Sequence, residues 1–392
     1  MNWNSILPYH HGIWNLRQFL LVLLLASVTG CSTSSDVAES GPGGAQNDVA
    51  LVSRDDSIGT ASSPRRRRVS KHLQRLSEYQ LFRGDLADLV PSAGVVPYDV
   101  NTPLFTDYAG KHRVIRLPEG ASAPYNASKV FDFPVGTVIA KTFYYDRDMT
   151  DPARGRRLIE TRILLHDPTG WIGLPYVWNE QQSDATLSLT GGAADVQWVH
   201  FDGNPRENRH LIPNFNDCKR CHENSKNEPI GPTARNINRD FQYDDGSENQ
   251  LDRWSRVGLI SGAPPSDQAP RLAAWNAPET GSLDHRARAW LEVNCAHCHS
   301  PIGPARNSGL HLHADVTNLY RLGIFKTPVA AGRGTGGRLY DIVPGKPDES
   351  ILMHRLETDH AGEMMPELGR SLVHVEGAEL IRDWIESLPP ES

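Results

Sequence analysis

Four of the five cysteines in this 392-residue chain fall into two copies of one pattern. Cys218 and Cys221 enclose two residues and are followed by His222, and the same spacing recurs in residues 295–299. Cys-x-x-Cys-His is the attachment signature of c-type haem, in which two thiols bond to the porphyrin and the histidine ligates the iron. The sequence therefore predicts two covalently bound haem c groups, attached through Cys218, Cys221, Cys295 and Cys298, with His222 and His299 as iron ligands.

Other uses of two cysteine pairs fit this spacing less well. A structural zinc site usually has about 15–20 residues between its pairs. Cys221 and Cys295 are much farther apart, and zinc gives no reason for a histidine after each pair. Two disulfides remain an alternative in an exported chain. A thioredoxin-like redox pair would need a βαβ context, which the flanking sequence lacks.

The N-terminus has the layout of an export signal. Arg17 precedes the apolar run 19–26, and small residues then lead to Cys31. The run is shorter than the about 20 apolar residues that a spanning helix needs. It resembles the lipobox of bacterial lipoproteins, which implies a signal peptide over residues 1–30 and lipidation of Cys31. An ordinary cleaved signal with a chance cysteine is the alternative. We expect an exported chain, lipid-anchored to a bacterial membrane and facing the periplasm or cell surface.

The composition is that of a folded protein behind a tether. The hydrophobic fraction of 39% and the net charge of −7 are ordinary for soluble domains and give no reason to expect nucleic-acid binding. Residues 31–77 begin rich in Ser, Gly, Ala and Asp, which predicts a flexible tether. Its arginine run 65–68 is either a patch for anionic lipid headgroups or a solvated linker run.

Residues 78–203 have the pattern of a β-rich domain. Short runs of β-branched and aromatic residues are separated by turns that contain Gly and Pro. The pattern predicts a β-sandwich or barrel-like domain. The fold class is thus multidomain α+β, with helical cytochrome c-type haem modules after the β domain. The expected strands cover residues 112–117, 136–145, 159–165, 185–189 and 196–200.

The two cysteine motifs lie in different surroundings. The first is in residues 204–280, where Pro213 and nearby asparagines predict a loop over residues 210–217. A short helix is expected near residues 250–257. The second is in residues 281–392, where apolar stripes predict one helix that runs into the motif and another at the C-terminal end. Paired terminal helices beside a haem are the arrangement of class I cytochromes c, which this segment resembles.

A methionine is the expected sixth ligand of the second haem. Met364, Met365 and Pro366 resemble the Met-Pro ligand loop of bacterial cytochromes c, and they lie between the haem helix and the C-terminal helix. Met365, directly before the proline, is the predicted ligand and Met364 the second option. Packing is the alternative role for both.

The sixth ligand of the first haem stays open. No methionine lies between Met149 and Met353, so a ligand local to this motif is not methionine. The sequence offers the following alternatives: His200, His210, Met149, Met353, Met364 or water, with Met353 better suited to packing.

Beyond the tether, the chain resembles a family of exported bacterial diheme c-type cytochrome lipoproteins. The resemblance covers roughly residues 79–388 and rests on the segments 97–109, 134–143, 212–214 and 294–299. It implies an electron-transfer role outside the cytoplasmic membrane and leaves the substrate unassigned.

Three functions follow from these patterns. The first is a membrane-tethered diheme cytochrome that relays single electrons from a periplasmic dehydrogenase or quinol-oxidising donor to a respiratory acceptor. The second is a diheme oxidoreductase, a peroxidase or small-molecule dehydrogenase, with haem 1 as the reactive centre. The third is a binding lipoprotein that uses its β domain. Relay is favoured because no acid/base constellation stands out near residues 218–222, so no catalytic residue is assigned.

Overall fold

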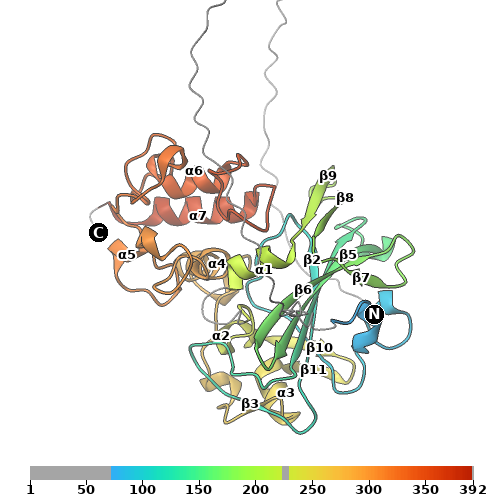
Figure 1. The fold of residues 1–392 in the computed structure, drawn as a ribbon. Helices are drawn as coiled ribbons and strands as arrows, with labels where there is room; N and C mark the ends of the chain where they lie inside the picture. Colours follow the sequence, from blue (N-terminus) through green and yellow to red (C-terminus); the bar gives the residue numbers. More distant parts are fainter. Residues whose placement is uncertain (1–71, 223–228, 391–392) are drawn as a thin grey trace, which may run out of the picture. The chain divides into compact units, whose positions relative to one another are not determined.

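The computed structural model describes residues 72–222 and 229–390. It has an α+β fold, with a six-stranded antiparallel sheet in the N-terminal half and short helices later (Figure 1). The α+β class is therefore confirmed. The expected signal peptide, the lipidation residue Cys31 and the arginine run 65–68 lie outside the described residues.

The main sheet includes four strands that the β-rich pattern predicts and two that it does not. Each of the five expected segments contains an observed strand, and four of these strands belong to the main sheet. Across that sheet the order is β1-β2-β4-β5-β6-β7. The strands are β1 (Val96–Tyr98), β2 (Gly110–Arg116), β4 (Val138–Asp146), β5 (Arg156–Asp167), β6 (Gly170–Trp178) and β7 (Ala185–Leu187). Short pairs form from β3 (Ala123–Pro124) with β12 (Ile260–Ser261), and from β10 (Asp240–Tyr243) with β11 (Gly246–Asn249).

The two faces of the sheet bury different cores. Successive side chains of a strand point to opposite faces. Val114 and Ile163 therefore pack against the first described segment, which includes the turn η1 (Leu76–Tyr79). Ile115 and Ile139 pack in a second core on the other face. Both faces are thus covered, and the second face also receives the first cysteine motif.

A separate hairpin leads into that motif. β8 (Gly192–Val199) pairs with β9 (Pro205–Ile212), and a helix begins at Phe215, so the loop expected over residues 210–217 is wrong in its first and last parts. Pairing with β8 satisfies the backbone groups that a loop would leave to water. Helix α1 (Phe215–His222) then begins directly after Asn214, whose side chain accepts hydrogen bonds from the first turn.

The C-terminal part is helical and has its own core. α4 (Leu283–Leu291) and α7 (Val375–Ser387) are the helices that the apolar stripes predicted, and they pack against each other. α4 continues into a π-helix, Glu292–Ala296. α7 lies between α4 and α6 (Ile351–Glu357) (Figure 1). No helix in the described part of the chain is long and apolar enough to cross a membrane. The remaining helices are α2 (Ala234–Ile237), α3 (Gln250–Arg256), which confirms the helix expected there, and α5 (Leu319–Leu322).

Candidate haem sites

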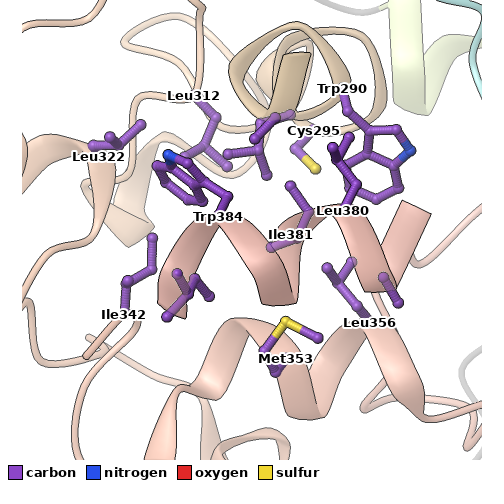
Figure 2. Close-up of a cluster of buried hydrophobic side chains, with 14 of the residues drawn as sticks. Trp290, Cys295, Leu312, Leu322, Ile342, Met353, Leu356, Leu380, Ile381 and Trp384 are labelled. Carbon is purple, nitrogen blue, oxygen red and sulfur yellow. The ribbon is translucent and has the colours of Figure 1, made fainter. Parts of the chain in front are cut away.

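The second motif begins on a π-helix that follows α4. π-Helical turns are rare and often mark functional sites. Cys295 lies in this turn with its thiol in the C-terminal core, beside Trp290, Leu380 and Ile381 (Figure 2). Burial, and then the neighbouring Cys298, raises the pKa of Cys295 to about 12. The thiol is therefore protonated and faces apolar side chains.

His299 is held so that one ring nitrogen can ligate a metal. Its Nδ1 lies 3.0 Å from Oγ of Ser308, and this hydroxyl donates its own hydrogen to the Ala305 carbonyl at 2.7 Å. The Ser308 oxygen must therefore accept from an Nδ1–H of His299, which leaves the lone pair on Nε2. Burial lowers the pKa of His299 to about 4, with a further contribution from His297. The neutral ring, with Nε2 as acceptor, is the form that iron binds.

Replacing Ser308 with alanine should weaken this positioning. The variant leaves the His299 Nδ1–H without its acceptor, and loss of such a partner typically costs about 10–100-fold in metal affinity or activity. Because thioether bonds would still hold the haem in this variant, we expect a changed midpoint potential and weaker ligation by His299. Spectroelectrochemistry measures both changes. Ser308→Thr, which keeps the hydroxyl, is the matched control. An unchanged potential in Ser308→Ala would contradict the role.

Gly303 lets the chain turn back onto the motif. A Cβ at this position would collide with the carbonyl group of Cys298 and lie 2.9 Å from Oγ of Ser300. The Ala305 N–H donates to the same Cys298 carbonyl at 3.1 Å. Close approach of two backbones requires glycine. This turn brings Ser308 within reach of His299.

Met365 lies on a loop whose backbone is held from two sides. Its N–H donates to the Arg355 carbonyl at 2.9 Å, and Nε of Arg370 donates to the Met365 carbonyl at 3.1 Å. Arg370 is only 5% exposed and also donates to the carbonyls of Leu372, Arg355 and Thr358. The same guanidinium interacts electrostatically with Cys295. Arg370 thus ties the loop that carries Met365 to the surroundings of the second motif.

Met353 has the packing role expected for it. It is fully buried on α6, and Figure 2 shows it on the opposite side of α7 from Cys295. α7 therefore lies between Met353 and the second motif.

A β-domain loop holds the end of the Met365 loop. The buried Asp107 carboxylate accepts hydrogen bonds from the N–H groups of Ser371 (2.7 Å) and Leu372 (2.8 Å). It also accepts from the Ser371 hydroxyl at 2.7 Å and the Asn208 amide at 3.1 Å. Asp107 and Tyr108 both have positive φ, 47° and 63°, which costs about 1 kcal/mol or more per residue and needs support from the surroundings.

The same loop also contacts the helix that leads into the second motif. The Phe105 N–H donates to Oδ1 of Asn294, the residue before Cys295, at 2.9 Å. The Phe105 ring stacks on His374 at 4.2 Å, and Trp290 Nε1 donates to Nδ1 of His374 at 3.1 Å. The segment 97–109, prominent in the sequence resemblance, is therefore the part of the β domain that contacts both the motif and the methionine loop.

The first motif lies on the main sheet. Helix α1 packs on β6, where Gly173 leaves room for Cys218. A Cβ on Gly173 would lie 2.9 Å from Cβ and 3.3 Å from Sγ of Cys218. Residues 223–228 and the Cys221 side chain lie outside the described parts. The absence of a side chain at Gly173 thus lets the Cys218 side chain pack directly on the sheet.

Gly173→Ala should therefore impair haem attachment at the first motif. The added methyl forces Cys218 to move by several tenths of an ångström, and overpacking of this kind costs about 1–3 kcal/mol. We expect a lower haem-to-protein ratio with the second haem retained, measured by haem absorbance against protein mass. Gly231→Ala, at a site where a Cβ meets no atom within 4 Å, is the matched control.

The two histidines proposed as sixth ligands for the first haem are engaged elsewhere. His210 contacts Tyr145 OH through Nδ1 at 3.2 Å and the Glu160 carboxylate through Nε2 at 2.9 Å. His200 accepts from Trp198 Nε1 at 3.3 Å and faces Glu376 with Nε2 at 3.5 Å. Neither ring presents an unused nitrogen. Met149 packs against the core around Trp198, and Met364 is in the Met365 loop.

His166 was not considered from sequence, and its geometry suits ligation. It lies on β5 and shares a sheet face with Leu164, which pairs with Gly173 of β6. His166 itself pairs with Trp171, two residues from Gly173. Its Nδ1–H donates to the Phe133 carbonyl at 2.7 Å, which leaves a lone pair on Nε2. Its ring stacks on Trp171 at 4.6 Å.

The other residues that sequence reasoning missed are Asp107, Ser308 and Arg370. They act through contacts between distant parts of the chain, and no local spacing signals them. Within residues 72–222 and 229–390, no cluster of three or more His, Cys, Asp or Glu side chains could hold a metal ion by itself.

Comparisons with protein-family models, curated proteins and solved structures found no match for this chain.

Proposed function

We propose that this chain is a membrane-tethered diheme c-type cytochrome that relays single electrons. The observation that carries the proposal is the Ser308–His299 hydrogen bond, which orients a neutral histidine directly after a buried attachment cysteine. When bound, each haem would supply a one-electron couple. The finer fold proposal is that the C-terminal helices form a class I-like cytochrome module and that the β-rich part is sandwich- or barrel-like.

The chain's own residues would fix the ligands of the second haem. Ser308 orients His299, Arg370 holds the backbone of Met365, and Asp107 holds the loop beyond it. Such preorganisation lowers the ordering cost of a weak thioether bond and favours a six-coordinate centre that is closed to substrate. A centre of this kind suits electron transfer to a protein partner.

The remaining proposals concern location and partners. Cys31 would carry the lipid that tethers the chain to a bacterial membrane, with the folded part in the periplasm or at the cell surface. The donor would be a dehydrogenase or quinol-oxidising complex, and the acceptor a cytochrome or oxidase. Nucleic acid is not an expected partner.

One observation favours the second candidate, a diheme oxidoreductase. Because His200 and His210 are both engaged, neither fills the sixth position of haem 1, and an open position would bind small molecules. His166 instead offers a sixth nitrogen, which would close that position.

The spin state of the purified exported protein separates the two functions. Relay predicts that both haems are low-spin by electron paramagnetic resonance and that peroxide and carbon monoxide leave the spectrum unchanged. A high-spin haem 1 that binds either ligand would replace the relay proposal with the oxidoreductase. His166→Ala in the same assay should convert haem 1 to high-spin if His166 closes it.

A further inference from the structure

Three strands of the main sheet place cationic side chains in adjacent rows of one face. Arg113 of β2 lies opposite Lys141 of β4, which lies opposite Arg162 of β5. Lys111 is two residues from Arg113 and opposite Phe143. Side chains two residues apart share a face, so all of these residues point to the side where Cys218 lies.

Three of these cations surround one aromatic ring. The distances to the Phe143 ring centroid are 5.7 Å for Lys111 Nζ, 5.2 Å for Lys141 Nζ and 4.1 Å for Arg162 Cζ. The ring is fully buried, and the β4–β5 register shifts directly after it. Bulges of this kind redirect side chains and are common beside functional sites. Lys111, Lys141 and Arg162 are called the cationic cluster below.

Two described carboxylates near the cluster pair with arginines of the same sheet face, and the charge of Asp107 also acts on Lys111. Arg113 pairs with Asp99 at 2.6 Å, and Arg162 pairs with Glu160 at 2.6 Å. Lys111 donates to the Ala109 carbonyl at 2.9 Å, and within residues 72–222 and 229–390 it forms no ion pair. Burial, and then the charges of Arg113, Lys141 and Arg162, lowers the pKa of Lys111 well below its ordinary value. Such a group is costly unless an anion approaches it.

The first cysteine motif borders the cluster. Leu164, two residues from Arg162, lies opposite Gly173, against which Cys218 packs. In the loop beside Lys111, the buried Thr106 hydroxyl has no hydrogen-bond partner among the described residues.

We propose that the cationic cluster binds the propionate carboxylates of a covalently attached haem. The inference rests on the proposed function, because the attached haems are the anions that the chain itself brings to this place. A propionate is a carboxylate on a short chain, and lysine and arginine bind such groups by charge-assisted hydrogen bonds of about 2.7–2.9 Å. The β sheet would thereby set the potential of that haem as well as cover it.

The test is the midpoint potential of each haem in Lys111→Gln and Lys141→Gln. Loss of a nearby positive charge favours the ferric state, so the potential of the bound haem should fall. A tenfold change in the ratio of oxidised to reduced haem corresponds to about 59 mV for one electron. Lys111→Arg, which keeps the charge, should leave the potential near that of the parent. Lys129→Gln, at an exposed lysine, is the matched control.

The same titrations show which of the two haems supplies the propionate. Haem content is measured first, because chains without covalent haem would refute the proposed function rather than the cluster. Adding Met365→Leu identifies the redox wave of the second haem, because this substitution shifts the potential of that haem alone. If the lysine variants lower only that potential, the cluster binds a propionate of the second haem. If they lower only the other potential, it binds a propionate of the first haem. If both haems are attached and neither potential moves more than in Lys129→Gln, the inference is wrong.

Discussion

Asp107→Ala is expected to destabilise the holoprotein by about 3 kcal/mol or more. The substitution removes the acceptor of four hydrogen bonds at a buried site, and each buried donor left unsatisfied costs about 1–3 kcal/mol. Alanine also tolerates the positive φ of 47° less well than aspartate does. Urea unfolding of the purified protein, followed by far-ultraviolet circular dichroism, measures the change.

The Asp107→Ala variant should also loosen the Met365 loop. A change in methionine ligation would show that Asp107 positions this loop as well as stabilising the fold. We expect a fraction of the second haem to lose its methionine, visible in the optical spectrum of the oxidised protein. Asp107→Asn is the matched control, since asparagine accepts positive φ and keeps one acceptor oxygen. It should lose less stability. Parent-like stability and ligation in Asp107→Ala would contradict the link between the loop and Asp107.

Met365→Leu is expected to lower the midpoint potential of one haem by on the order of 100 mV, within the ~0.8 V that axial ligands span. A thioether ligand raises the potential, and leucine has the same bulk with no donor atom. Spectroelectrochemical titration of both haems measures the effect. The redox wave of the other haem, which should not shift, serves as an internal reference.

Two other methionines provide controls for this titration. Met353→Leu keeps core volume and costs less than about 1.5 kcal/mol, so it should leave both potentials unchanged. Met364→Leu distinguishes the neighbouring sulfur. If Met364→Leu lowers the potential and Met365→Leu does not, the ligand is Met364.

The sequence predicted those parts of the molecule that local patterns determine. The β-rich runs predicted four of the six strands of the main sheet, and the apolar stripes predicted α4 and α7. The strand β9 was not foreseen, because Pro205 and Pro213 bracket a polar segment whose pairing with β8 depends on the hairpin as a whole. The π-helical turn at Cys295 likewise has no signature in the local pattern.

The site shows the same division. The cysteines and histidines are evident from spacing, whereas the residues that position them are not. Ser308 reaches His299 only because Gly303 allows a tight turn. Asp107 is 264 residues from Ser371 along the chain, and only the folded structure brings the two together. His210, a candidate ligand from sequence, is instead bound by the Glu160 carboxylate. Burial raises the pKa of Glu160, but Arg162 and His210 outweigh this effect and lower the pKa to about 2.

The covalent haem content of the exported chain decides whether it is a diheme c-type cytochrome. The protein is purified from a host that attaches c-type haem, and haem and iron are measured per chain after denaturation and extraction. We expect two haems and two irons that stay with the polypeptide, and one haem in Cys295→Ser/Cys298→Ser. A chain that carries zinc and no covalent haem would contradict it.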